Sequence, residues 1–357
     1  SILAVDFSIF PRYLAKTETW GVSLMDLGTG AYLVSSAVTS RTARGLECGG
    51  RSGHGSSMGM LLLLLLLGVG RPLALAALNY PQHRSEYGRH WSFFLTLLGV
   101  WAIALVVHRV VRSGIVVAIL SAGGLGCYQL ALSQSGLSGY VLGAAHDSSQ
   151  SNNSMSAASI LSPAAASANL LSGASLLLDE NREGVWSLAG YAPLFLLAEQ
   201  LARLALHPPS APAPRSSDSV PAGLSEGSAA AARRRLPATA LALWLLFGAS
   251  YSLVQLPSRR LCNLTYVLFV LACAVSLLTA LRAADQLLWP AAPATARPLR
   301  SLALLSKHAL AVFLLGNVLT GLVNLLAAPL DRSAAAALAL LLGYAALLAW
   351  GVVALGS

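Results

Sequence analysis

Charged residues are scarce in this sequence of 357 residues, where Asp, Glu, Lys and Arg together make up 10%. Lysine is scarcer still, because only Lys16 and Lys307 stand among the 23 basic residues. Apolar runs of about 18 residues or more recur along the chain, and they exclude an ordinary soluble domain. The net charge of +9 does not indicate nucleic-acid binding, because the arginines lie mostly between apolar runs without stacking aromatics.

Motifs for metal, nucleotide and hydrolase chemistry are missing as well. The four cysteines lack metal-ligand spacing, and neither a Gly-x-Ser-x-Gly elbow nor an HExxH zinc helix occurs. Gly21, Gly28 and Gly30 do not meet the spacing of a nucleotide loop. His83 and His90 are seven residues apart, which suits polar contacts at helix ends better than metal binding. We therefore predict no metal and no permanently bound cofactor.

The apolar runs predict an all-α fold, a polytopic bundle of transmembrane helices in one membrane-embedded domain, residues 1–357. The runs are too long and too poorly alternating for barrel strands, and helices satisfy their own backbone groups in lipid. Two long connections interrupt the bundle, a lumenal loop at 133–185 and a disordered cytosolic linker at 207–236. Residues 157–178 are an alternative tenth span. The nine predicted spans are 21–38, 58–79, 91–108, 113–132, 186–206, 238–256, 262–281, 303–326 and 335–355.

Basic residues predict how the bundle is oriented. Loops that start at 41, 109, 203 and 282 share one side, and that side is the richer in Lys and Arg. Because positive loops are retained in the cytoplasm, this side and the C-terminus are predicted to be cytosolic, and the first segment is predicted to face the lumen or the exterior. The glycosylation tripeptide at Asn152 lies in a loop predicted to be lumenal, which agrees with this orientation.

Polar residues of mixed type gather in four stretches on the predicted lumenal side, whereas the other side carries arginines almost alone. Carboxylates, amides, imidazoles and an amine that converge at one end of a bundle indicate a polar pocket. Ordinary helix caps and interfacial charges are the alternative for each stretch. The stretches contain Asp6, Arg12, Lys16 and Glu18; Asn79, Tyr80, His83, Glu86, Tyr87 and His90; Asn181, Arg182 and Glu183; and Arg259, Arg260 and Asn263.

Further polar residues lie inside the predicted spans. Asp26 falls in the first span, and Asn317, Thr320 and Asn324 recur at spacings of three and four on one helix face. Amides there either bind a ligand or lock helices together by hydrogen bonds. Arg71 interrupts the second span and needs a partner, for which Asp26 is a candidate.

Five ordered motifs carry a resemblance to a known family. They are VDFSIFPRYLAKTETWGVSLMDLG (5–28), NYPQHRSEYGRHWSFFLTL (79–97), NREGVWSLAGY (181–191), SRRLCNLTYVLFV (258–270) and NVLTGLVN (317–324). Together they resemble the glycosylphosphatidylinositol (GPI) inositol acyltransferases. The resemblance spans most of the chain and implies that further helices precede Ser1.

The resemblance implies a multi-pass enzyme of the endoplasmic reticulum membrane. Such enzymes transfer a fatty acyl group, typically palmitoyl, from the co-substrate acyl-CoA to the inositol 2-hydroxyl of the membrane lipid glucosaminyl-phosphatidylinositol. The essential aspartate and lysine of the family's lumenal loop match Asp6 and Lys16. Ser8 stands where proline is usual and Tyr13 where a second arginine is common, which affects the local loop and one anionic contact.

The residue types suit this reaction. An alcohol that attacks a thioester needs a base, for which we predict Asp6, and a group that stabilises the oxyanion, for which we predict Lys16. Lys16 could instead keep Asp6 ionised. Cations suit the lipid phosphate, and amides and carboxylates suit the sugar. The predicted substrate-binding residues are Arg12, Glu18, Asp26, Glu86, His90, Asn181, Arg182, Glu183, Arg259, Arg260, Asn263, Asn317 and Asn324.

Three other functions compete with this interpretation. A transporter or flippase for a lipid-linked sugar predicts inverted repeats, and the motifs do not recur between halves. An assembly subunit without catalysis would be favoured if Asp6 or Lys16 were replaced, and both are present. A different class of membrane acyltransferase uses a histidine deep in a helix with an upstream asparagine, a setting that His108 and His308 lack.

Overall fold

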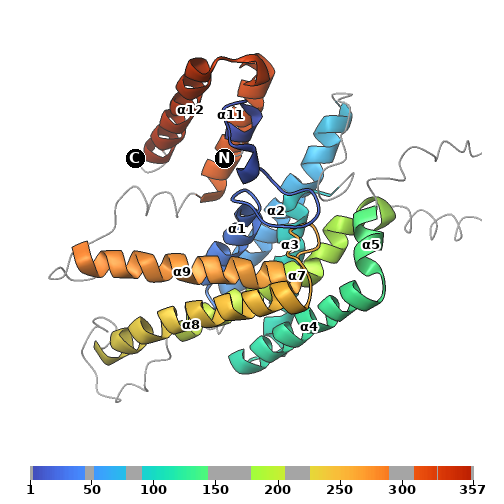
Figure 1. The fold of residues 1–357 in the computed structure, drawn as a ribbon, viewed down its shortest axis with the longest axis vertical. Coiled ribbons are helices and arrows are strands. Elements are labelled where there is room, and N and C mark those ends of the chain that lie inside the picture. Colours follow the sequence, from blue (N-terminus) through green and yellow to red (C-terminus); the bar gives the residue numbers. More distant parts are fainter. Residues whose placement is uncertain are drawn as a thin grey trace, which may run out of the picture. The chain divides into compact units, whose positions relative to one another are not determined.

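The computed structural model describes residues 3–44, 52–77, 91–143, 178–205, 226–288, 309–327 and 329–354. Within these residues every regular element is a helix, which confirms the predicted all-α class (Figure 1). The chain divides into two compact units. Unit 1 comprises Ser1–Lys16, Ser23–Asp26 and Leu281–Ser357, and unit 2 comprises Thr17–Val22 and Leu27–Ala280.

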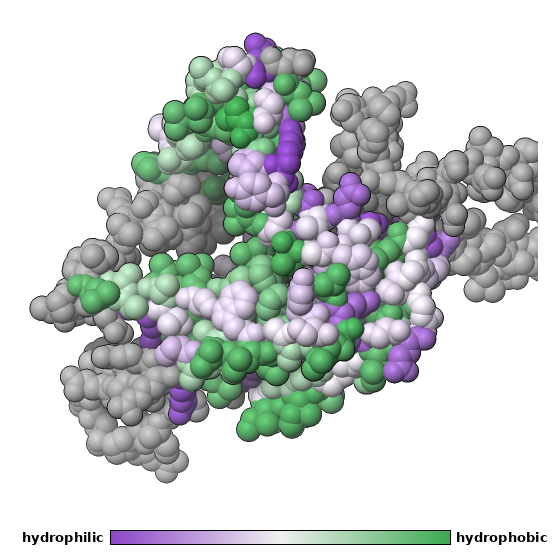
Figure 2. All heavy atoms as spheres, in the orientation of Figure 1, coloured by the Kyte–Doolittle hydropathy of each residue, from purple (hydrophilic) through white to green (hydrophobic). Residues whose placement is uncertain are grey.

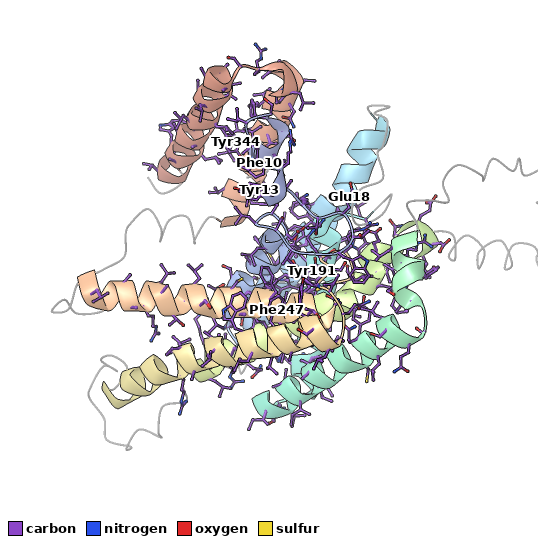
Figure 3. The ribbon with its side chains drawn as sticks, viewed as in Figure 1. Phe10, Tyr13, Glu18, Tyr191, Phe247 and Tyr344 are labelled. Atoms are coloured by element: carbon purple, nitrogen blue, oxygen red, sulfur yellow. The ribbon has the colours of Figure 1, made fainter. Side chains whose placement is uncertain are left out.

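Unit 2 holds most of the helices, and its interior is built around α7. The helices are α1 (Leu27–Val38), α2 (Ser52–Ala77), α3 (Phe93–Val110), α4 (Gly114–Gln134), α5 (Leu137–Leu142), α7 (Arg182–Ala205), α8 (Glu226–Leu253) and α9 (Leu264–Leu288), of which α9 ends in unit 1. Helix α7 packs against α1, α3 and α4. Its Tyr191, labelled in Figure 3, is fully buried and meets Tyr266 of α9 edge to face, so aromatic rings fill the centre of this unit.

Unit 1 contains α11 (Ala309–Ala327) and α12 (Ala334–Ala354), which are joined through the short 3₁₀ helix η6 (Pro329–Asp331) and pack against each other. The N-terminal segment adds two short 3₁₀ helices, η1 (Ala4–Asp6) and η2 (Arg12–Leu14). Leu3 and Phe7 are almost fully buried and pack with Ala337 of α12. Burial of these apolar side chains fixes the segment that carries Asp6 on the helix pair.

Each of the nine stretches predicted as a membrane span overlaps one of these helices. Five of them are long and apolar enough to cross a membrane: Phe93–Val110, Gly114–Gln134, Arg235–Leu253, Leu264–Ala284 and Ala334–Gly351. Shorter apolar helices cover Leu27–Val38, Met58–Gly70 and Ala311–Ala327. Green apolar side chains dominate the visible surfaces of α4 and α8 in Figure 2, as lipid-facing helices require. The chain is therefore a polytopic membrane protein.

Several predicted boundaries were wrong. The predicted loop at 133–185 contains α5 and the first turn of α7. The first span was predicted from residue 21, but α1 begins at Leu27, because Ser23 to Asp26 form a turn in which the Ser23 amide donates to Asp26 Oδ2 over 2.9 Å. The resulting helix of 12 residues is about 18 Å long, shorter than a hydrocarbon core of about 30 Å. The linker was predicted to run to 236, but α8 begins at Glu226. Residues 206–225, like 144–177 in the predicted lumenal loop, lie outside the described part.

Candidate functional site

The predicted base, Asp6, lies at the end of η1 in unit 1 and is partly buried. Its Oδ2 accepts a hydrogen bond from Asn324 Nδ2 of α11 over 2.9 Å. These two residues are 318 positions apart and belong to two of the five motifs. The structure therefore brings together a carboxylate and an amide that sequence analysis selected separately, and the amide fixes the direction of the carboxylate.

Arg12 and Lys16 follow Asp6 in the same unit and are both exposed. Arg12 begins η2 and donates from Nη1 to the carbonyl of Val5 over 3.0 Å, which ties η2 back to η1. Leu14 accepts a hydrogen bond from the Met25 amide over 3.3 Å, so the Asp26 turn supports this segment. We call Asp6 and Asn324 the Asp6 cluster; Arg12 and Lys16 belong to the same unit.

Asn317 does not join the Asp6 cluster. Its Nδ2 donates to the Phe313 carbonyl of its own helix over 2.8 Å. One turn further on, Thr320 Oγ1 donates to the carbonyl of Gly316, which also accepts from the hydroxyl of Tyr344 on α12. Thr320 Oγ1 also lies 3.4 Å from Tyr344 OH, so Thr320 helps to hold α11 to α12, and of the three polar residues predicted on this face only Asn324 reaches Asp6.

A second polar cluster lies in unit 2, where α7 begins and the segment between α8 and α9 turns. Arg260 donates from Nε to Glu183 Oε2 over 3.0 Å and from Nη2 to Glu183 Oε1, a bidentate pair with both side chains largely buried. Nη1 donates to the carbonyl of Glu18 over 3.1 Å. We call Glu18, Glu183 and Arg260 the Arg260 cluster. The positive charge of the Arg260 guanidinium is therefore paired with the negative charge of the Glu183 carboxylate.

Asn263 holds the segment between α8 and α9 in shape. Its Oδ1 accepts from the amides of Ser258 and Tyr266, and its Nδ2 donates to the carbonyl of Leu256 over 2.8 Å. These bonds form an N-terminal cap on α9. The geometry therefore favours a structural role for Asn263 over the substrate contact predicted from the sequence. Ser258 Oγ donates to the carbonyl of Thr19 over 2.6 Å, which attaches the segment before α1.

Sequence analysis missed two glutamines that support this segment. Gln129 of α4 donates to Gln255 over 2.9 Å and accepts from the Leu264 amide over 3.0 Å. A glutamine at position 129 in an apolar run was the available signal, because a buried amide in a membrane helix needs a partner. Tyr128 OH also donates to the carbonyl of Leu261, so α4 supplies two anchors.

The segment makes its closest approach at Gly190 of α7. A Cβ built on Gly190 would overlap the backbone oxygen of Cys262, so only glycine fits here. Cys262 itself has a φ of 48°, a left-handed conformation that is uncommon outside glycine. The Cys262 side chain is fully buried, so its thiol is shielded from solvent.

Arg259, Asn181 and Arg182 flank the Arg260 cluster in unit 2. Arg259 and Asn181 are buried, and Arg259 accepts a hydrogen bond at its carbonyl from Tyr191 OH over 3.3 Å. The guanidinium of Arg182 stacks on Tyr140 of α5 at 4.7 Å and lies 3.6 Å from Asp179 Oδ1. The hydrogen bond from Tyr140 OH to Asp179, over 2.5 Å, raises the pKa of that phenol.

Another buried carboxylate, which sequence analysis did not select, lies toward the other end of α7. Glu199 accepts from Ser40 Oγ over 2.6 Å and meets His108 Nε2 at 2.5 Å. The ends of α1 and α3 therefore meet α7 here, which places the loops that start at 41, 109 and 203 at one end of unit 2, as predicted. An acidic residue inside an apolar run was the signal.

Some predicted residues lie outside the described part. These are Glu86, His90 and the side chain of Arg71. The pairing of Arg71 with Asp26 therefore stays a prediction. Among the residues that the structure describes, no three His, Cys, Asp or Glu side chains converge in a way that could hold a metal ion.

Comparisons with known proteins agree with the motifs. A family model described as GWT1 matches residues 1–355. The chain is 33% identical to GPI-anchored wall transfer protein 1 of Aspergillus fumigatus over 98% of this chain and 67% of the relative. The proteins of the same name in Gibberella zeae and Kluyveromyces lactis are 32% and 30% identical, over 99% and 98% of this chain and 69% and 68% of theirs. The chain therefore belongs to the GWT1 family, the acyl-CoA-dependent inositol acyltransferases of GPI biosynthesis in the endoplasmic reticulum membrane.

Proposed function

We propose that this protein transfers a fatty acyl group, typically palmitoyl, from acyl-CoA to the inositol 2-hydroxyl of glucosaminyl-phosphatidylinositol, with Asp6 as the general base. The observation that carries the proposal is the hydrogen bond from Asn324 to Asp6. A base needs a fixed direction toward the proton that it removes. The amide engages Oδ2 and leaves Oδ1 to accept the proton of the hydroxyl.

The reaction balances with these groups. Asp6 takes the proton of the 2-hydroxyl as its oxygen attacks the thioester carbonyl, and the carbonyl becomes a tetrahedral oxyanion. The intermediate collapses, the carbon–sulfur bond breaks, and the departing thiolate of coenzyme A takes the proton back from Asp6. Lys16 belongs to the same unit, and we assign its ammonium to the oxyanion, where such a charge contributes several kcal/mol.

The predicted substrate-binding arginines differ in their exposure and in whether a carboxylate balances their charge. Arg12 is exposed and uses only Nη1 in the bond to Val5, so we assign it to the lipid phosphate. Arg260 shares its charge with Glu183, so it is less suited to a phosphate than Arg12 is. Asn181 and Arg182 stand beside Glu183 at the start of α7, and their contact with substrate stays a prediction from the sequence.

We also propose that the nine α-helices other than α5 span the membrane, with the Asp6 cluster facing the lumen and the C-terminus facing the cytosol. The excess of basic residues on the loops at 41, 109, 203 and 282 supports this orientation. Helices shorter than the bilayer are accommodated where the lipid thins or where neighbouring helices cover their ends.

The proposal is tested in microsomes that contain the full-length protein, labelled palmitoyl-CoA and glucosaminyl-phosphatidylinositol. We expect acyl-inositol product from wild type and a loss of about 10²-fold or more from Asp6→Asn, because general base catalysis contributes on this scale. Asp331→Asn, which removes a carboxylate from η6 of the same unit, is the control and should retain turnover. Turnover by a correctly inserted Asp6→Asn protein would remove Asp6 as the base.

A further inference from the structure

The end of unit 2 that holds Glu199 also contains the first turn of α4. Ser113, the residue before the helix, makes no side-chain capping bond, and the first helical hydrogen bond runs from the Val117 amide to the Ser113 carbonyl. The amides of Gly114, Ile115 and Val116 therefore have no acceptor within the helix. These amides and the helix dipole make this end of a 21-residue helix attractive to an anion.

Two side chains of α7 converge on the same turn. A Cβ built on Gly114 would lie 2.5 Å from Gln200 Oε1 and 3.3 Å from Arg203 Nη1, so both side chains reach the first residue of α4. Gln200 is only 6% exposed, and its Nε2 is buried without a hydrogen-bond partner among the residues that the structure describes. A buried amide donor left unpaired costs free energy, so it indicates an acceptor that binds from outside the chain.

The charge around this turn is positive. Glu199, the adjacent carboxylate, has its two oxygens engaged by Ser40 and His108. Ser40 precedes Arg41 and Arg44, and His108 precedes Arg109 and Arg112, so these contacts bring basic residues to the same end. Arg203 is a further basic residue at this end and is partly buried. The exposed arginines are Arg41, Arg44, Arg109 and Arg112.

We propose that the N-terminus of α4, Gln200 and Arg203 form a binding site for a phosphate group. Backbone amides, a neutral amide donor and a guanidinium are the donors that a phosphate takes, and the side chains of Gln200 and Arg203 both reach the turn that carries the amides. The phosphate comes from coenzyme A of the acyl donor or from the head group of an anionic phospholipid. The first source rests on the proposed function, whereas the site itself does not.

The test uses the full-length protein in nanodiscs of phosphatidylcholine and measures the binding of coenzyme A by calorimetry, so that no turnover is needed. We expect Gln200→Glu and Arg203→Gln each to weaken binding by about ten-fold, the loss of one charge-assisted hydrogen bond. Gly114→Ala should act in the same direction, because the added methyl displaces the Gln200 amide. Arg235→Gln, on the exposed surface of α8, is the control for general charge and should change binding by less than about two-fold.

A second arm replaces part of the lipid with phosphatidylinositol and measures retained lipid by native mass spectrometry. Loss of coenzyme A binding in the variants supports the site with the donor as the source. Loss of retained phosphatidylinositol alone supports the site with a head group as the source. Unchanged binding of both probes in folded Arg203→Gln and Gly114→Ala proteins overturns the site. Asp6→Asn should bind coenzyme A normally, so its failure in turnover is distinct from failure here.

Discussion

At the scale of single residues, the Asp6 cluster rests on one hydrogen bond between distant parts of the chain. Asn324 is a positioning residue, because its amide holds the carboxylate of Asp6 and touches no reacting atom in the proposed mechanism. Asn317, seven residues earlier on the same helix, gives its amide to the carbonyl of Phe313. Two amides that look equivalent in the sequence therefore have different roles in the folded chain.

This difference predicts the effect of replacing each amide. We expect Asn324→Leu to lower kcat by about ten-fold with KM nearly unchanged, because the base loses its direction while the substrate contacts remain. Asn317→Leu should lower kcat much less. Acyl-transfer kinetics with both substrates varied check this prediction. Equal losses in the two variants, or a loss expressed in KM, would contradict a positioning role for Asn324.

Lys16 allows a second prediction at this scale. Lys16→Arg keeps the charge but replaces a compact ammonium by a wide guanidinium, so we expect most of the activity to be lost. Single-turnover assays separate the acyl-transfer step from binding. If Lys16 supplied only plain charge, the variant would retain wild-type rates.

At the scale of elements, helix positions followed from apolar runs, because a run long enough to span lipid has few alternatives to a helix. The start of α1 did not follow, since the turn at Ser23 to Asp26 contains apolar residues that hydropathy counts as helix. Asp6 and Asn324 could both be selected from the sequence, because each lies in one of the five motifs. The supports from Gln129 and Gln255 were not, because the sequence gives no distance between α4 and the segment before α9.

The contact between α7 and that segment gives a prediction about stability. Gly190→Ala inserts a methyl group into the backbone oxygen of Cys262, and backbone yields less than a side chain, so we expect destabilisation of at least about 1–3 kcal/mol. Gly123→Ala, in α4 with nothing within 4 Å of the new methyl, is the matched control and should be neutral or slightly stabilising. Thermal unfolding in detergent compares the two, and equal melting temperatures would contradict the close packing.

At the scale of the whole molecule, the contacts of unit 2 define two ends. Ser40, His108 and Glu199 meet at one end, and Glu18, Glu183 and Arg260 meet at the other. The Arg260 cluster and the contacts of Glu199 are therefore separated along the helices of unit 2.

Helix α4 provides the sharpest test of orientation, because exposed residues flank it on both sides. Val110 ends α3 and is 76% exposed, and Tyr140 of α5 is 46% exposed. Helix α4 between them has 21 residues, about 32 Å, which matches one hydrocarbon core. In a cysteine-free protein in sealed microsomes, we expect an impermeant maleimide to label Val110→Cys directly and Tyr140→Cys only after permeabilisation. Labelling of both from the cytosolic face would show that α4 does not cross the membrane, and the reverse pattern would place the Asp6 motif on the cytosolic side.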